Sequence, residues 1–185
     1  MEFPPCWDAM VFKILLILLV LIALFLIVAA FQPSDFRITR NGLIAAPPPV
    51  VFGQVNDLRK WEEWSPWAKL DPAMKQTYDG PATGVGAVST WVGNKQVGEG
   101  KMTIVESRPF DLIRIELEFY KPMAATNETE FHFAPEGDQT RVVWSMTGRR
   151  NFMMKAFGLV TNMDKMVGGQ FEEGLNRLNT AVRQP

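Results

Sequence analysis

An uninterrupted apolar run near the N-terminus limits what this chain of 185 residues can be. Residues 14–31 read ILLILLVLIALFLIVAAF, which is 18 positions without a charged or polar side chain. A helix rises about 1.5 Å per residue, so the run covers about 27 Å, close to the roughly 30 Å hydrocarbon core of a bilayer. Because the run is apolar on every side, it does not resemble the buried helix of a soluble protein. We therefore predict a single-pass membrane helix over residues 14–31.

A cleaved signal peptide is the alternative interpretation of this run. The apolar region of a signal peptide usually has about 7–15 residues, fewer than here, but small residues at 28–30 could form a cleavage site. The side of the membrane on which the rest of the chain lies is undetermined. Lys13 precedes the run, and Arg37 and Arg40 follow it, which is too small a difference for the positive-inside rule.

The composition excludes several classes of function. Lys and Arg total 19 and Asp and Glu total 20, so the net charge is −1 and sequence-independent binding to nucleic acid is not expected. The single cysteine, Cys6, excludes an internal disulfide framework and multi-thiolate metal sites. The single histidine, His132, excludes a metal site built from several histidines. We expect no cofactor and no metal.

Hydrophobic periodicity divides the remainder of the chain. We expect an N-terminal tail over residues 1–13, the membrane helix, a linker over 32–35 and one domain over 36–185. The pattern predicts strands over 36–44, 75–78, 85–92, 96–106, 112–120, 126–133 and 141–147. It predicts short helices over 49–55 and 58–64, a Met- and Phe-rich flap over 151–162, and a long amphipathic helix over 163–182.

The strand over 112–120 shows the pattern best. Ile113, Ile115, Leu117 and Phe119 fall on one face, and the residues between them are mostly charged. A sheet with one apolar face needs a cover, and the long C-terminal helix is the one substantial element available. We therefore predict an α+β fold in which a curved antiparallel sheet of six or seven strands surrounds that helix. Side chains alone often do not fill such an interior, so we expect a cavity.

Several stretches, in this order and spacing, resemble the START-like or SRPBCC superfamily, and most nearly its single-domain polyketide cyclase-like members with an N-terminal anchor. The stretches lie at 44–52, 56–57, 61–67, 98–104, 140–146 and 168–175, and the resemblance runs from 36 to about 178. It implies a helix-grip fold with an internal hydrophobic cavity. Superfamily members bind lipids, sterols, aromatic polyketides or other apolar ligands, and some catalyse cyclisation or dehydration. The superfamily has no universal catalytic set, so the resemblance by itself assigns no activity.

Alternation and helical spacing predict which side chains line the cavity. The predicted ligand-binding residues are Trp91, Met102, Leu117, Phe119, Phe131, Trp144, Met146, Met163, Val167 and Phe171. The tryptophans at 61, 64 and 67 have two interpretations: they pack the short helices against the sheet, or they form a cavity mouth or a surface resting on lipid.

No residue is assigned a catalytic role from the sequence, and Glu99 is the one candidate. It lies between Gly98 and Gly100, where a bulge could turn its carboxylate into the cavity and raise its pKa. The alternative is a solvent-facing strand residue. His132 falls on the polar face of its strand, beside Glu128 and Glu130, where an exposed structural role is expected.

From these features we predict a membrane-anchored protein that binds a hydrophobic small molecule or lipid. Two alternatives belong to other classes. One is a cyclase- or dehydratase-type enzyme acting on an apolar substrate, and the other is a protein-interaction module with a filled core.

Overall fold

The computed structural model describes residues 6–183, and these form two compact units. One unit contains α1 (Cys6–Phe31) with the linker to Ser34, together with the segment Arg150–Asn162, which holds α5 (Phe152–Val160). The other unit runs over Asp35–Arg149 and resumes at Met163. The first unit is therefore built from two separate stretches of the chain.

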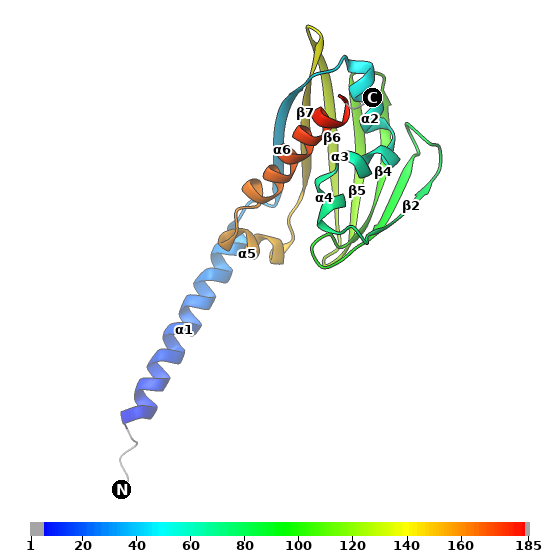
Figure 1. The fold of residues 1–185 in the computed structure, drawn as a ribbon. Helices are drawn as coiled ribbons and strands as arrows, with labels where there is room; N and C mark the ends of the chain where they lie inside the picture. The colour runs from blue at the N-terminus through cyan, green and yellow to red at the C-terminus, as the bar shows by residue number, and fades with distance from the viewer. Residues whose placement is uncertain (1–5, 184–185) are drawn as a thin grey trace. The chain divides into compact units, whose positions relative to one another are not determined.

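The second unit contains one antiparallel sheet of seven strands (Figure 1). The strands are β1 (Asp35–Ile44), β2 (Lys75–Asp79), β3 (Val88–Val92), β4 (Glu99–Arg108), β5 (Leu112–Lys121), β6 (Ala125–Glu136) and β7 (Gln139–Arg149). Their order in the sheet is β1-β7-β6-β5-β4-β3-β2, so the last strand returns to pair with the first. Asp35 lies opposite Arg149, and Ile44 lies opposite Thr140.

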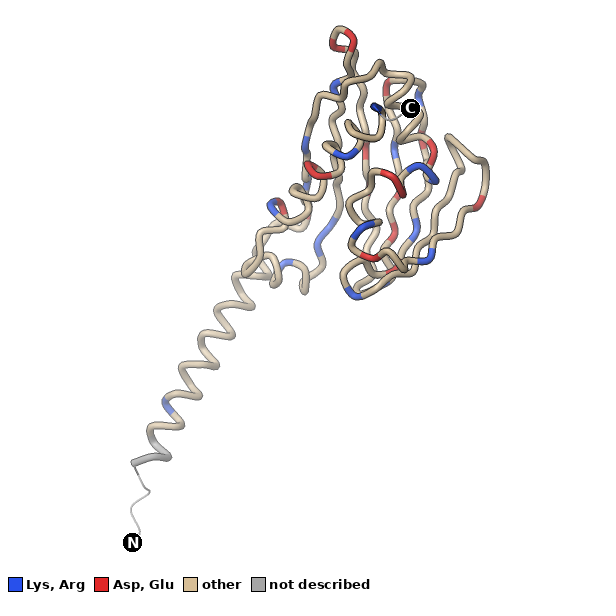
Figure 2. The backbone as a smooth tube through the Cα atoms, in the orientation of Figure 1, with Lys and Arg blue, Asp and Glu red and all other residues tan. Residues whose placement is uncertain are grey.

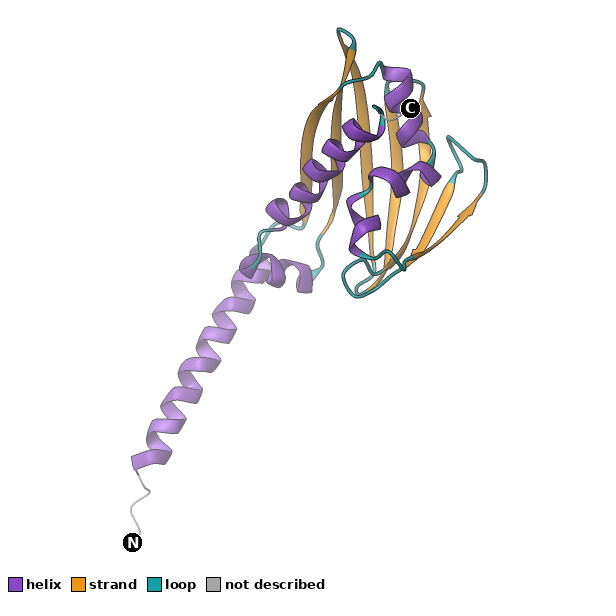
Figure 3. Cartoon of the chain, viewed as in Figure 1, coloured by secondary structure: helices purple, strands orange, loops and turns teal. Residues whose placement is uncertain are grey.

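Helices of this unit cover one face of the sheet (Figure 3). They are α2 (Pro48–Asn56), η1 (Leu58–Lys60), α3 (Trp61–Trp64), α4 (Pro66–Leu70) and the long α6 (Met163–Ala181). Prolines occupy the first turns of α2 and α4, where their missing N–H costs no hydrogen bond. The helix α6 packs against β1, α3 and α4. The predicted α+β fold, with its open antiparallel sheet and long C-terminal helix, is confirmed.

Ion pairs and a glycine fix α6 to β1. Arg40 projects from β1 and donates from Nε to Glu172 at 2.6 Å and from Nη2 to Asp164 at 2.9 Å, and both carboxylates belong to α6. Gly168 lies directly beneath this guanidinium, which occupies the place a Cβ would take. Gly169 has no such neighbour within 4 Å. Gly168 thus permits the close approach of the Arg40 guanidinium to α6, whereas no neighbouring group requires a glycine at position 169.

Two strands begin later than their sequence pattern predicts. Residues 85–87 and 96–98 were expected to be extended, but β3 begins at Val88 and β4 at Glu99. Gly86 and Gly98 have φ of 88° and 72°, a left-handed conformation that breaks a strand. Turn hydrogen bonds replace the expected pairing before β4, because Asn94 Oδ1 accepts from the backbone N–H groups of Gln96 and Val97.

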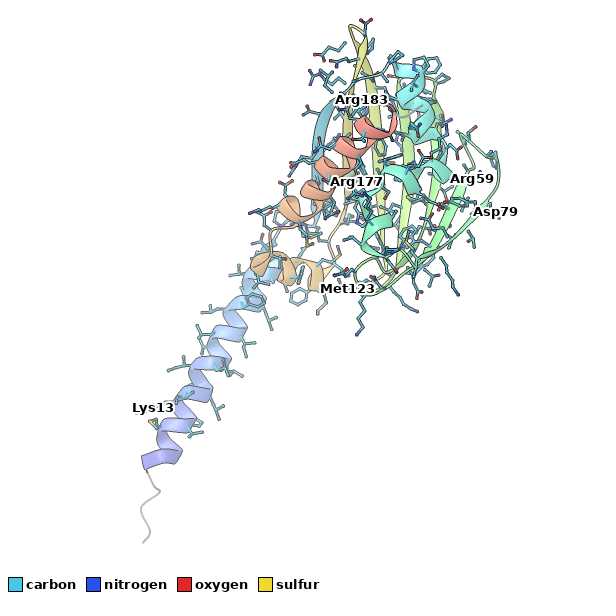
Figure 4. The ribbon with its side chains drawn as sticks, in the orientation of Figure 1. Lys13, Arg59, Asp79, Met123, Arg177 and Arg183 are labelled. Carbon is cyan, nitrogen blue, oxygen red and sulfur yellow. The ribbon has the colours of Figure 1, made fainter. Side chains whose placement is uncertain are left out.

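The helix α1 is uncharged over most of its length. From Met10 to Phe31 it is long and apolar enough to cross a membrane, and Lys13, near its N-terminal end, is the one charged residue of this span (Figures 2 and 4). Its apolar side chains are exposed on all sides, for example Phe12 at 67% and Leu19 at 65%. Within this span Ala29 alone is fully buried, and α1 packs against α5.

Candidate functional site

A cavity of about 260 Å³ lies between the sheet and the helices α3, α4 and α6. Six strands, β2 to β7, place side chains in its wall, and the inward faces of these strands supply them. The lining is mainly aromatic and aliphatic. A pocket with this lining suits an apolar ligand that is oriented by a few polar groups.

Stacked aromatic rings form the wall beneath α6. The indole of Trp144, on β7, lies parallel to the ring of Phe171, on α6, with 4.2 Å between centroids and 6° between planes. Trp67, on α4, contacts both rings edge-to-face at 6.0 and 6.3 Å. Such contacts add about 0.5–1.5 kcal/mol each beyond area burial, so they stabilise this wall in the absence of a ligand.

A second aromatic pair stands across the sheet. Trp91, on β3, meets Phe119, on β5, edge-to-face with centroids 5.8 Å apart. The indole of Trp91 lies over Gly100, where a side chain would occupy the same space. Because β3 and β7 are four strands apart in the sheet, Trp91 and Trp144 are separated by roughly 19 Å along it, and Phe119, on β5, lies midway between them.

The three tryptophans at 61, 64 and 67 divide between the two interpretations of their cluster. Trp64 has no exposed surface and is a core residue. Trp61 and Trp67 line the cavity. The indole N–H groups of Trp61 and Trp64 donate to the carbonyls of Val55 at 2.9 Å and Gln54 at 3.3 Å, which fixes the rings against α2.

Eight of the ten predicted lining residues lie in the wall of this cavity: Trp91, Met102, Leu117, Phe119, Trp144, Met146, Val167 and Phe171. Phe131 does not, because its ring is fully buried between Trp61, Trp64 and Trp144. Met163 does not either, since it is the first residue of α6, a full turn before Val167. For these two positions the predicted placement was wrong.

The sequence prediction did not place several other wall residues in the cavity. These are Trp61, Ser65, Trp67, Met74, Gln76, Gln96, Val97, Ile115, Lys121, Pro122 and Thr129. Alternation puts Ile115 on the same face as Leu117 and Thr129 on the same face as Phe131, and this was the available signal for both. The others lie mostly on short helices, loops and strand ends, where no periodic pattern reveals which way a side chain points.

Two buried polar atoms in the wall residues lack a hydrogen-bond partner. They are Oγ1 of Thr129 and Nε1 of Trp144, in residues that are 5% and 2% exposed. Thr129 lies opposite Met146 in the β6–β7 ladder and therefore diagonal to Trp144 on the same face. A buried polar group without a partner costs about 1–3 kcal/mol.

Lys121 is the charged residue in the lining, and it explains the position of Glu99. The Lys121 Nζ donates to Glu99 Oε1 at 2.8 Å. The register of β4 and β5 shifts between Glu99 and Gly100, but the extra residue is Tyr120 on β5, so the irregularity is not in the strand of Glu99 where the sequence suggested a bulge. Glu99 pairs with Lys121 and does not line the cavity.

Two further titratable groups lie away from the cavity wall. His132 is half exposed, with Nε2 at 3.6 Å from Glu130. Burial and the neighbouring Glu62 raise the pKa of Tyr78, whose hydroxyl lies 2.6 Å from Oε1 of Gln76, a wall residue. The phenol therefore stays protonated, and its single O–H donates to Glu62 Oε1 at 2.7 Å. Within residues 6–183, no group of three or more His, Cys, Asp or Glu side chains is arranged to hold a metal ion.

A curved, open antiparallel sheet packed against a long C-terminal helix, with an apolar cavity between them, defines the ligand-binding helix-grip class. The chain belongs to the family described as polyketide cyclase / dehydrase and lipid transport, whose sequence model matches residues 35–183. The expected superfamily is thereby confirmed. A comparison with curated proteins finds no match.

Solved structures share the fold at low sequence identity. Zhui aromatase/cyclase from Streptomyces sp. R1128 has a TM-score of 0.59 and 13% identity, with 80% of this chain and 94% of that chain covered. A protein from Rhizobium leguminosarum has a TM-score of 0.61 and 13% identity, with 83% of this chain and 98% of that chain covered. Protein CV1439 from Chromobacterium violaceum has a TM-score of 0.58 and 15% identity, with 83% of this chain and 100% of that chain covered. At such identities these likenesses establish the fold alone.

Proposed function

We propose that this protein is a membrane-anchored binding protein that holds an apolar small molecule or lipid in the cavity between the sheet and α6. The observation that carries the proposal is the cavity itself, about 260 Å³ in volume and walled by two aromatic pairs and aliphatic side chains. Each 100 Å² of apolar ligand surface removed from water contributes roughly 2.5 kcal/mol. Burial would therefore supply most of the affinity.

The volume limits the size of the ligand. An engineered apolar cavity of about 150 Å³ holds one benzene ring, so 260 Å³ suits a bicyclic aromatic compound or a short acyl chain.

The proposed anchor is α1. Its span Met10–Phe31 has 22 residues, about 33 Å as a helix, which matches a hydrocarbon core of roughly 30 Å. The exposure of its apolar side chains supports an environment of lipid for this helix. An anchored cavity would take up an apolar ligand beside the bilayer in which such ligands dissolve.

Native mass spectrometry of the full chain, released from detergent micelles, tests the binding proposal. Met102 and Val105 both lie on β4, but Met102 lines the cavity and Val105 is 42% exposed. Met102→Trp should fill the cavity and abolish a bound mass, either co-purified or supplied as N-phenyl-1-naphthylamine, an uncharged aromatic probe. Val105→Trp should retain it.

Equal binding by the two variants would contradict a site in this cavity. A wild-type protein that carries no co-purified ligand and takes up no probe would contradict the binding function as a whole. Circular dichroism of each variant establishes that the comparison is made between folded proteins.

A further inference from the structure

The short helix α5 carries an apolar face that its own unit leaves exposed. Phe152, Met153, Phe157 and Val160 are 46%, 65%, 49% and 71% exposed. At about 100° per residue, these four side chains fall within a sector of roughly 140° on the helix surface. A contiguous exposed patch of large apolar side chains marks an interaction surface.

The ends of α5 are closed by hydrogen bonds, so its nine residues form a defined element. Asn151 Oδ1 accepts from the backbone N–H of Met154 at 2.9 Å at the start. The Thr161 hydroxyl donates to the carbonyl of Phe157 at 2.8 Å at the end. These caps stabilise the helix, so its exposed apolar side chains stay on one face.

Contacts within the first unit hold α5 at the C-terminal end of α1 (Figure 1). Ala29, in the last turn of α1, is fully buried, whereas Phe31 is 86% exposed. The backbone N–H of Arg150 donates to the carbonyl of Ser34 at 2.7 Å, which joins the segment before α5 to the linker after α1. If α1 spans a bilayer, its last turn lies where the acyl chains meet the headgroups.

The geometry points to a bilayer surface as the partner of this face: we propose that α5 lies in the membrane interface, with Phe152, Met153, Phe157 and Val160 among the upper acyl chains. Lys155 is the one charged residue in α5 and lies about 60° outside the apolar sector. A cation there suits lipid phosphates, and apolar burial on one face with a basic residue on another is typical of interfacial helices. This inference rests on the proposed anchoring of α1.

Fluorescence quenching in vesicles tests it with the full chain. In a Cys6→Ser background, single cysteines are introduced as Phe157→Cys or Met153→Cys on the apolar face, Lys155→Cys as the matched control, and Leu21→Cys within α1. Each is labelled with NBD in phosphatidylcholine vesicles that contain phosphatidylcholine with a doxyl group near the headgroup end of one acyl chain. We expect quenching several-fold stronger at 153 and 157 than at 155, and aqueous iodide should show the reverse order.

The control in α1 separates the two proposals. Leu21→Cys should be shielded from iodide and quenched when the doxyl group is placed deep in the chain. If the label at Leu21→Cys is shielded but the labels at 153 and 157 are quenched no more than the label at 155, the anchoring of α1 is supported and the interfacial position of α5 is refuted. Labels at 153 and 157 that neither iodide nor doxyl lipid reaches would place protein over the face and also overturn the inference. If Leu21→Cys is open to iodide, the anchoring itself fails and the inference fails with it.

Discussion

Gly169 and Gly174 belong to the same helix, α6, but meet different surroundings. A Cβ at Gly169 would have no neighbour within 4 Å, whereas a Cβ at Gly174 would lie 2.7 Å from Cζ3 of Trp144. Gly169→Ala should therefore raise the free energy of unfolding by about 1 kcal/mol, through helix propensity alone. Gly174→Ala should lower it by about 1–3 kcal/mol, because the stacked Trp144–Phe171 wall cannot move aside. Denaturant unfolding measures both free energies. An increase in the free energy of unfolding for Gly174→Ala would show that Trp144 and Phe171 can move to accommodate the methyl group.

Two buried threonines give a second matched pair. Thr129 Oγ1 has no partner, whereas Thr140 Oγ1 donates to the carbonyl of Ala46 at 2.7 Å. Replacing Thr129 with valine should stabilise the ligand-free protein by about 1 kcal/mol, and Thr140→Val should destabilise it by a similar amount. Equal losses at both positions in thermal unfolding would mean that the Thr129 hydroxyl is satisfied after all.

At the scale of single residues, the sequence predicts the cavity wall where strands alternate and where the long helix repeats its apolar positions, as at Val167 and Phe171. Leu117 and Phe119 are examples, since the sheet allows them just two directions. Alternation also places Phe131 on the inner face, but it cannot distinguish a ring enclosed by Trp61, Trp64 and Trp144 from one that borders an empty space. That distinction depends on side chains from α3, which lie far away in sequence.

The attachment of α6 to the sheet should depend on pH. The Arg40 guanidinium donates hydrogen bonds to Asp164 and lowers the pKa of that carboxyl below its usual 3.8. A pKa that is lower in the folded protein means stability that is present above about pH 4 and is lost as the pH falls through the folded value. Asp164→Asn should thus lower the unfolding temperature at neutral pH and low salt, and the difference from wild type should disappear once the pH has fallen below the folded pKa of Asp164.

Glu173→Gln is the control for that experiment, because Glu173 pairs with Arg177 inside α6 and makes no link to β1. Its effect on the unfolding temperature should be smaller than that of Asp164→Asn. A difference between wild type and Asp164→Asn that persists unchanged in acid would refute the role of the carboxylate charge.

At the scale of elements, the sequence predicts the strands better than the short helices: all seven strands were expected, but α4 was not, and α5 was expected only as a flap. Both ends of β5 were predicted to within one residue by alternation, whereas β6 ends three residues later than predicted and β7 extends two residues further at each end. The starts of β3 and β4 were missed because Gly86 and Gly98 adopt left-handed conformations, and glycine in a strand pattern does not by itself reveal its φ. The pairing of β1 with β7 follows from no local signal.

At the scale of the whole molecule, membrane association should depend on α1. Arginine near the centre of a membrane helix costs about 2.5–3.5 kcal/mol, so Leu21→Arg with Leu24→Arg should move the protein from membranes into the soluble fraction after an alkaline carbonate wash. Val105→Arg, on an exposed strand position, should leave it in the membrane pellet. Release of the wild-type protein by the same wash would contradict the anchor.

The pairing of the first strand with the last sets an order of events during synthesis. β1 follows α1 directly in the chain, but its partner β7 is made roughly a hundred residues later, which takes about 5–20 s on a ribosome. During that interval the backbone N–H and C=O groups of β1 have no strand to bond, while the helix before it is already available for insertion. The sheet is completed only when β7 arrives between β1 and β6, so a nascent chain arrested before Gln139 carries an open strand next to its membrane helix.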